Sequence, residues 1–314
     1  MPGGSDVGDR TGEATRLDDQ IWQIDLGFSG QDGVIAAYLL AGDDELALID
    51  TGPSSTLPAL RAGIRAAGFD PAAITHVLVT HIHLDHSGAV GLLAREAPRL
   101  TARVHPLGAP HLIDPARLEA SAGRLYGDRM EELWGEIAPM PAARTDILAD
   151  DEPIAVAGRM VTAIFSPGHA SHHVAYWDER SGTLFTGDVG GVRVQGTSYV
   201  CPPTPPPDLD PAAWRVSVDR LRALGARRLC PTHFGAFDDV AAHWDQLMPN
   251  LARFEELARK AGSDEAALTR LIHASYAGAL EGDMDALARL EWASPSYVAA
   301  PGLVRLLRKR GELT

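Results

Sequence analysis

One stretch, residues 80–88, constrains the fold of this chain more than any other. It reads Thr-His-Ile-His-Leu-Asp-His-Ser-Gly and contains four side chains that can bind a metal, namely His81, His83, Asp85 and His86. The run before it, 76–79, predicts a buried strand, and the run after it, 89–93, predicts the start of a helix. Because open α/β sheets bind ligands where a strand turns into a helix, we expect a site at this turn.

The spacing of the four side chains indicates two neighbouring metal positions. Alternate residues of an extended chain point to the same side, so His81 and His83 can face one ion together. Asp85 and His86 lie past the bend and can turn toward a second ion. Imidazole nitrogens and carboxylate oxygens suit zinc, iron or manganese without a thiolate. A single histidine is more often a packed or surface residue, but four candidate ligands within six positions favour a metal site.

The chain contains four further motifs, one before residues 80–88 and three after them. They are Leu48-Ile49-Asp50-Thr51-Gly52, Pro167-Gly168-His169, Thr186-Gly187-Asp188 and Pro231-Thr232-His233. Together the five motifs resemble those of the metallo-β-lactamase superfamily, over roughly residues 20–237. The resemblance implies an α/β fold of the αββα sandwich type with an appended helical domain, similar to the glyoxalase II and lactonase-like branch. The motifs are more specific for the fold than for the substrate.

The same resemblance implies a dinuclear metal centre. His81, His83 and His169 would bind the first ion, and Asp85, His86 and His233 the second, with Asp188 as the bridge. We expect two divalent ions, zinc before iron or manganese. A bridging hydroxide would attack a carbonyl or phosphoryl group, with Asp85 and Asp188 as catalytic ligands. Asp50 is the candidate hydrogen-bond acceptor behind a ligand imidazole.

Candidates for substrate contact come from loops beside the ligands. They are Arg193, Tyr199 and Phe234, and the hydroxyl of Tyr199 is expected to act in catalysis by donating to a carbonyl oxygen. The long loop from 190 to 211 contains the proline-rich run 202–207, which predicts a stiff wall beside the site. His172 and His173 are expected to line the cleft.

The order of patterns predicts the domain organisation. Residues 1–16 are expected to be a disordered leader, 17–237 the catalytic domain, and 238–314 a helical domain of four helices. An insertion at 106–141 predicts two helices. Their apolar positions are interpreted as packing, with a lid over the metals as the alternative; they are Leu118, Leu125, Met130, Leu133 and Trp134.

Charge and composition limit the partners. A net charge of −14 argues against a nucleic-acid surface, which needs clustered cations. No apolar run reaches the roughly 20 residues of a membrane span, and the two cysteines fit a reducing compartment. We therefore expect a cytoplasmic protein with a small-molecule substrate and no nucleic-acid or membrane partner; a homodimer is left open.

Three enzymatic functions compete at this stage, while the intact ligand set argues against a binding or scaffold protein with a vestigial site. The first is a metal-dependent hydrolase of a small ester, lactone or thioester, favoured by the full ligand set and the acidic charge. The second is an iron-dependent redox enzyme of the same fold, similar to persulfide dioxygenases. A phosphodiesterase or nuclease is the third, and the charge balance disfavours it.

Overall fold

The apolar and alternating runs of the sequence assemble into two β-sheets. The structure is a computed structural model that describes residues 12–313. The strands of the first sheet, in spatial order, are β1 (Ala14–Asp18), β2 (Ile21–Asp25), β3 (Ala36–Ala41), β4 (Leu46–Ile49), β5 (Ile74–Leu78), β6 (Thr101–Val104) and β7 (Thr145–Ile147). Those of the second sheet, in chain order, are β8 (Glu152–Val156), β9 (Arg159–Phe165), β10 (Val174–Asp178), β11 (Thr183–Phe185) and β12 (Arg228–Cys230).

Strand direction gathers the predicted ligands at one edge. In the first sheet, β4 and β5 are parallel, so Asp50 and the 80–88 stretch leave at the same end. In the second sheet, β11 and β12 are parallel, and β9 runs the same way because β10 is antiparallel to both β9 and β11. The loops that follow β9, β11 and β12 therefore begin at one edge, where parallel strands usually carry their ligand site.

The two sheets pack face to face, and alternate residues of a strand serve different sides. Tyr38 and Leu40 of β3 enter the core between the sheets, whereas Leu39 faces the helices on the other side. Tyr38 also donates to the carbonyl oxygens of Pro231 and Gly235, at 2.6 and 2.9 Å. Each large apolar side chain that is fully buried contributes about 1.5–3 kcal/mol, so this two-sided burial fixes the register.

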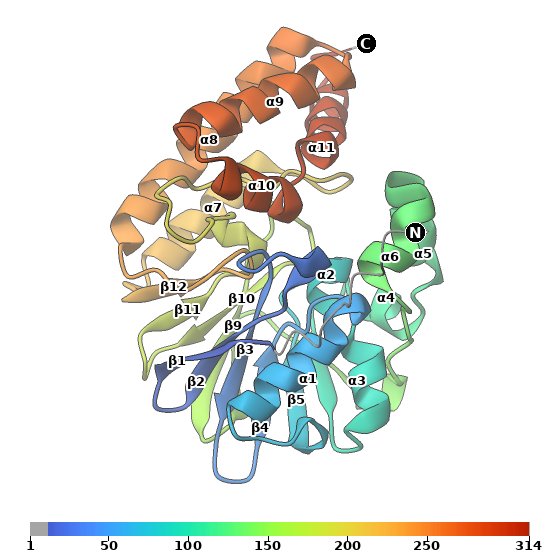
Figure 1. Ribbon diagram of the computed structural model, residues 1–314, viewed down its shortest axis with the longest axis vertical. Coiled ribbons are helices and arrows are strands. Elements are labelled where there is room, and N and C mark those ends of the chain that lie inside the picture. The colour runs from blue at the N-terminus through green and yellow to red at the C-terminus, as the bar shows by residue number, and fades with distance from the viewer. Residues whose placement is uncertain (1–11, 314) are drawn as a thin grey trace, which may run out of the picture.

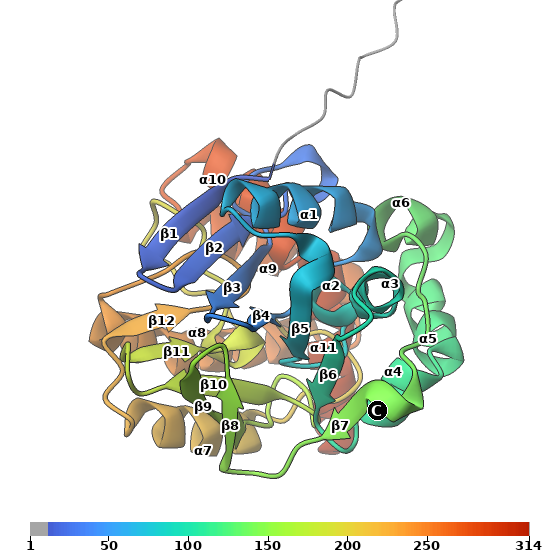
Figure 2. The same ribbon diagram turned by 90° about the horizontal axis from the view of Figure 1, so that it is seen from below.

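Helices cover both outer faces of the sheet pair. The helices are α1 (Leu57–Ala66), α2 (Leu84–Ser87), α3 (Val90–Glu96), α4 (Ala109–Ile113), α5 (Ala116–Tyr126), α6 (Met130–Trp134), α7 (Pro211–Arg222), α8 (Val240–Ala261), α9 (Glu265–Ala279), α10 (Met284–Ala293) and α11 (Ser296–Lys309). Helices α1 and α3 lie against the first sheet and α7 against the second (Figure 2). This arrangement confirms the predicted αββα sandwich.

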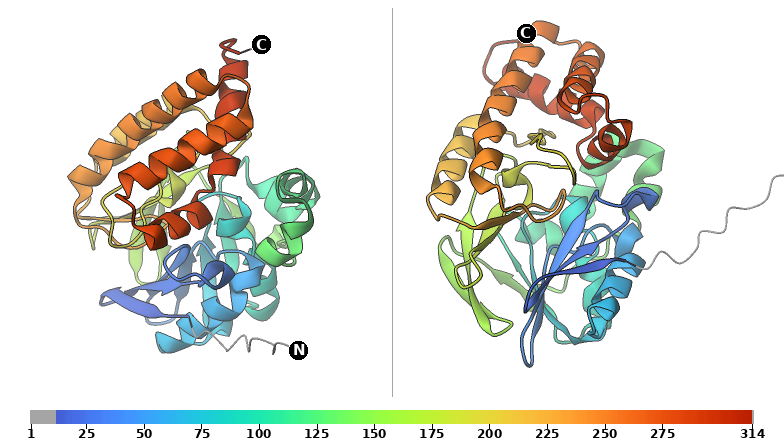
Figure 3. Two further views of the ribbon diagram at one scale, coloured as in Figure 1. Left: turned by 45° about the horizontal axis from the view of Figure 1, so that its top comes forward. Right: turned by 60° about the vertical axis from the view of Figure 1, so that its left-hand side comes forward.

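The last four helices form a layer across the edge where the ligand loops emerge (Figures 1 and 3). Within residues 238–313 they are four helices, as the sequence predicts for this region, and Asp264 and Asp283 cap α9 and α10 by accepting from backbone N–H groups. Trp244 and Leu247 of α8 are buried in a core that continues between the first sheet and its helices. The division of the chain near residue 237 stays a prediction.

The expected leader is wrong for the part that the structure describes. Residues 14–18 form β1, which pairs antiparallel with β2, and the guanidinium of Arg16 lies 5.6 Å from the ring centroid of Trp22. An edge strand can have a polar sequence, and such a sequence has the same composition as a disordered segment, so composition alone does not separate the two. Residues 1–11 lie outside the described residues. Across residues 12–313, no helix combines the length and the apolar character that crossing a membrane requires.

Candidate metal centre

The first predicted ligand cluster contains three histidines. His81 and His83 follow β5, His83 is the N-cap of α2, and His169 lies on the loop after β9. Nδ1 of His83 lies 2.9 Å from Nε2 of His81 and 3.1 Å from Nε2 of His169. Three imidazole nitrogens from two sheets therefore face one point, which suits one cation of the zinc type.

The second predicted cluster contains a carboxylate and two histidines. Asp85 and His86 belong to α2, and His233 follows β12. Oδ2 of Asp85 lies 3.3 Å from Nε2 of His233 and 3.9 Å from Nε2 of His86. The bend at α2 thus brings Asp85 and His86 together with His233, as the spacing predicted. His86 also remains close to His81, with ring centroids 3.9 Å apart, so the two clusters adjoin.

Asp188 lies between the two clusters. Its Oδ1 is 3.3 Å from Nε2 of His86 and 3.6 Å from Nε2 of His233, whereas its Oδ2 is 3.4 Å from Nε2 of His169. The two oxygens of one carboxylate therefore face different clusters. A carboxylate in this position could be shared by two cations.

The ligand imidazoles are held from behind. Nδ1 of His169 donates to the carbonyl oxygen of Pro203 and Nδ1 of His233 to that of Val34, both at 2.9 Å. Nδ1 of His86 lies 2.8 Å from Oδ2 of Asp50. Each contact places the proton on Nδ1 and leaves the Nε2 lone pair toward the centre, as metal-binding histidines need.

Asp50 organises more than one group. Its Oδ1 accepts from the backbone N–H of Thr80, and its Oδ2 accepts from the hydroxyls of Thr80 and Thr232 as well as from His86. The residue is fully buried and has a φ of 57°, a left-handed conformation that is strained for aspartate. The surrounding hydrogen bonds offset that strain, so the expected position behind a ligand is the one the structure shows.

The electrostatics of the centre fit divalent cations. Burial lowers the pKa of His83 to about 4 and lowers that of His169, so these imidazoles are neutral and can donate lone pairs. Burial also disfavours charge on His86, but the carboxylates of Asp188 and Asp85 outweigh it and raise the pKa of His86 above its ordinary value. Nε2 of His86, Nε2 of His233 and Oδ1 of Asp188 are buried and have no hydrogen-bond partner among residues 12–313. Unsatisfied buried groups each cost about 1–3 kcal/mol, and a cation shared by these three atoms would remove that cost.

The sequence predicts that His173 lines the cleft, but it is fully buried and acts as a positioning residue. Its Nδ1 donates to Oγ of Ser166, and its Nε2 accepts from the backbone N–H groups of Asp188 and Val189. A Cβ on Gly187 would lie only 2.7 Å from that Nε2, and φ of Gly187 is +49°, so the turn before Asp188 requires glycine. Gly187 leaves room for the His173 ring, whose hydrogen bonds hold the backbone that carries the Asp188 side chain.

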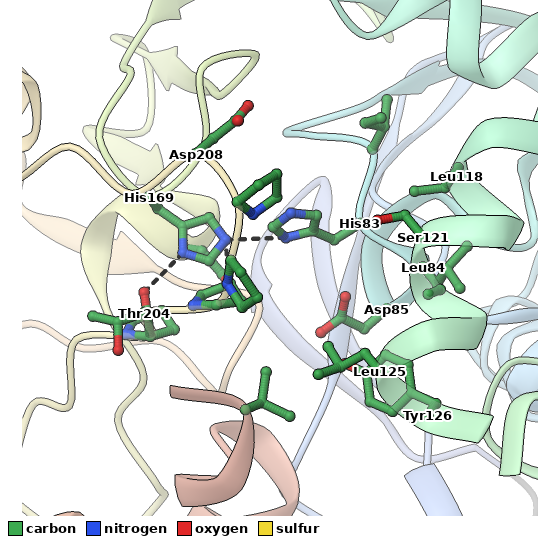
Figure 4. Close-up of a pocket in the computed structure, with 18 of the residues that line it drawn as sticks. His83, Leu84, Asp85, Leu118, Ser121, Leu125, Tyr126, His169, Thr204 and Asp208 are labelled. Atoms are coloured by element: carbon green, nitrogen blue, oxygen red, sulfur yellow. Dashed lines mark hydrogen bonds and ion pairs between the residues drawn. The ribbon is translucent and has the colours of Figure 1, made fainter. Parts of the chain in front are cut away.

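A cavity of 770 Å³ opens onto the ligand atoms (Figure 4). Its walls come from α5, from the loop at 203–208, and from the junction of α10 and α11. His83, Asp85, His169 and Asp188 line its floor. The proline-rich run therefore forms a wall beside the site, as expected, and the helical tail contributes another. His172 also lines the cavity, while His173 is buried beneath it.

The three substrate candidates lie elsewhere. Arg193 is buried, and its guanidinium pairs with both carboxylate oxygens of Asp239 at 2.7 and 2.9 Å. Phe234 belongs to the core between the sheets. Tyr199 packs against Tyr276 with ring centroids 6.4 Å apart. None of the three lines the cavity, because their backbones pass near the ligands while their side chains turn outward into packing.

The insertion at 106–141 supplies cavity-lining side chains, which the three substrate candidates do not. Leu118, Leu125 and Trp134 line the cavity, so packing is not the whole role of these three. The packing interpretation holds for Leu118, which packs against the core, and for Leu133 and Trp134, which are buried in it. Tyr126, at the end of α5, also lines the cavity, near Asp85 (Figure 4). Burial raises the pKa of its phenol above the usual range, so the hydroxyl remains a donor.

Comparison with known proteins agrees with this architecture. A family model of the metallo-beta-lactamase superfamily matches residues 30–233. A lactamase-like protein, adaB, of Aspergillus niger is 28% identical over 207 residues, which cover 65% of this chain and 51% of that protein. An atrochrysone carboxyl ACP thioesterase of Aspergillus fumigatus is 27% identical over 219 residues, covering 69% and 56%. The chain spans about half the length of these curated relatives.

Among solved structures, a metallo-beta-lactamase family protein from Thermus thermophilus is similar with a TM-score of 0.67 and 22% identity. The match covers 94% of this chain and 95% of that one, so the shared fold includes the C-terminal helices.

Proposed function

The chain belongs to the metallo-beta-lactamase superfamily, and on that premise we propose that it is a metal-dependent hydrolase of a small ester, lactone or thioester. One observation carries the proposal. The two carboxylate oxygens of Asp188 face separate ligand clusters, at 3.3 Å from His86 and 3.4 Å from His169, on the floor of a cavity large enough for a small organic substrate.

In this proposal the seven predicted residues hold two divalent cations. His81, His83 and His169 bind one, Asp85, His86 and His233 bind the other, and Asp188 is shared. Two such cations would supply a water acidified toward neutral pH and a Lewis acid for a carbonyl oxygen. Zinc suits this nitrogen and oxygen set best, with iron and manganese as the alternatives.

Residues around the floor of the cavity orient the ligands and contact the substrate. Asp50 and the carbonyl oxygens of Pro203 and Val34 keep the imidazoles oriented. The wall at 203–208 and helix α5 flank the ligand atoms, most of which are buried, and burial strengthens the charge interactions among them. The phenol of Tyr126 is available to donate to a substrate oxygen next to Asp85.

Among the three bond types, a thioester is the one we favour. A relative that shares 27% identity over 219 residues is named as a carboxyl ACP thioesterase. The cavity also has an apolar wall from α5, which suits the acyl part of such a substrate. In its hydrolysis water adds to the acyl carbon, the C–S bond breaks, and a carboxylate and a thiol leave.

The test compares substrates that share one acyl group. Zinc-loaded protein would be given the thioester, the aryl ester and a lactone of similar size, with Asp188→Asn and Asp43→Asn as variant and control. Asp43 lies in the turn between β3 and β4 and does not line the cavity. We expect chelator-sensitive hydrolysis, fastest for the thioester, that falls about 1000-fold or more in Asp188→Asn only. Hydrolysis that survives metal removal, or oxygen consumption without hydrolysis by iron-loaded protein, would overturn the proposal.

A further inference from the structure

The mouth of the cavity carries a cationic rim on a strongly acidic chain. Asp and Glu outnumber Lys and Arg by 42 to 28 in the whole sequence. Around the main cavity and the smaller one that adjoins it, the balance is reversed. The cationic rim consists of Arg117, Arg124, Arg305, Arg308 and Lys309.

The rim is continuous because Arg305 lines both cavities. The stretch 206–208 also lines both, so the smaller cavity, of 590 Å³, is an extension of the first along α11. Arg305, Arg308 and Lys309 are one helical turn apart and face it together. Arg117 and Arg124 are seven residues apart on α5, which forms another wall of the main cavity, and both line it.

These five cations have no protein counterion. Within residues 12–313, none of their side chains makes an ion pair or a hydrogen bond, whereas Arg220, Arg228 and Arg259 elsewhere are each paired with carboxylates. Apart from the metal ligands, only Asp208 and Glu265 bring negative charge to the two cavities. Asp208 already accepts a hydrogen bond from Oγ of Ser171 at 2.6 Å.

Between the rim and the metals lies an apolar stripe. Leu118, Ala122 and Leu125 follow the i, i+4, i+7 spacing of one helix face and line the cavity. No residue of α5 is fully buried; Leu118 and Ala122 pack partly against the core, and the stripe keeps an exposed surface toward the cavity. The order of surfaces from floor to mouth is therefore metal ligands, apolar stripe and cations.

We propose that the cationic rim binds the phosphate groups of the substrate's leaving arm, while the apolar stripe holds its acyl group. This rests on the proposed function, and it narrows the substrate class to acyl thioesters whose thiol arm is phosphorylated. Five cations facing two carboxylates leave more positive charge than a single carboxylate on a substrate would neutralise. A phosphate monoester carries nearly two negative charges and three acceptor oxygens, so it matches the rim better. Arginine's planar fork also suits phosphate oxygens.

The first test uses two thioesters with the same hexanoyl group. One has the phosphorylated arm of coenzyme A, and the other has N-acetylcysteamine, which lacks phosphate. We expect kcat/KM of the zinc-loaded protein to be at least about 10-fold higher for the phosphorylated substrate and to lose that advantage at high salt. Equal values for the two substrates at low salt would overturn the proposal.

Variants separate the rim from the chemistry. The substitutions Arg305→Gln, Arg308→Gln and Lys309→Gln, made together, should lower kcat/KM for the coenzyme A thioester about 10-fold or more and leave the N-acetylcysteamine thioester unchanged. Arg65→Gln on α1, an exposed arginine without an ion pair and outside both cavities, is the matched control and should change neither. An equal loss for both substrates in the triple variant would contradict the proposal.

A binding measurement decides the case even if no thioester is hydrolysed. Titration calorimetry would compare S-methyl coenzyme A with S-methyl pantetheine, which has neither a phosphate nor a free thiol. Tighter binding of the phosphorylated compound, lost in the triple variant, would support the rim although the thioesterase proposal had failed. Equal affinities would overturn the rim although hydrolysis was observed. Inorganic pyrophosphate, as a competitor, would show whether phosphate alone is enough or whether the arm is needed too.

Discussion

Nδ1 of His86 lies 2.8 Å from Oδ2 of Asp50, a residue 36 positions earlier that also accepts hydrogen bonds from Thr80 and Thr232. This carboxylate joins the ends of β4, β5 and β12 behind one metal ligand. The left-handed backbone of Asp50 directs its carboxylate toward His86, so the end of β4 and the His86 imidazole are held together.

Asp50→Ala should weaken the second cation without abolishing the centre. Loss of a partner behind a ligand typically lowers metal affinity about 10- to 100-fold. The free energy of unfolding should also fall, by about 2 kcal/mol, because buried donors of Thr80 and Thr232 lose their acceptor. Competition with a chromophoric chelator measures the affinity, with Asp43→Ala as the control. Wild-type affinity in Asp50→Ala would contradict the positioning role.

Tyr126→Phe and Tyr199→Phe should behave differently. The Tyr126 phenol faces the cavity, whereas Tyr199 packs against Tyr276 outside it. We expect Tyr126→Phe to lower kcat/KM about 10-fold through loss of one hydrogen bond, with metal content unchanged. Tyr199→Phe should leave the kinetics as in the wild type. The reverse pattern would return the catalytic role to Tyr199, as the sequence predicted.

His243 should make stability depend on pH. It is fully buried, its Nε2 donates to the carbonyl oxygen of Gly190 at 2.7 Å, and burial lowers its pKa to about 4. Between pH 4 and the unfolded value near 6.5, the unfolded chain binds the proton more readily, so stability falls as pH falls.

The size of that effect is roughly 3 kcal/mol across the window. Urea unfolding at pH 7.5 and pH 4.5, with the same chelator concentration, would compare the wild type with His243→Gln. The wild type should lose more stability than the variant by about that amount. Identical losses would show that His243 does not carry this proton.

The clustering of the seven candidate ligands could be predicted from the sequence, because their motifs are local and the strands before them end at one edge. Residues 81–86 fix their own directions through a strand and a bend, and His169, Asp188 and His233 each follow a short strand. The helices of the tail were predictable for a similar reason, since Asp264 and Asp283 are caps with clear signals.

Side-chain direction in loops could not be read in the same way. Arg193 lies five residues after Asp188, yet its guanidinium turns to Asp239, 46 residues further on. The cavity instead takes Leu118, Leu125 and Tyr126 from an insertion whose role depends on where α5 docks. Zinc, cytoplasmic location and a homodimer remain predictions.

The metal content of the purified protein tests the central claim most directly. Protein prepared without chelator and supplemented with zinc should contain two equivalents per chain, and Asp188→Ala should lose most of both because its carboxylate is shared. Asp85→Ala, which belongs to one cluster only, should retain about one equivalent. The account predicts this pattern of two, near zero and one. Less than half an equivalent in the wild type, or two equivalents in Asp188→Ala, would contradict it.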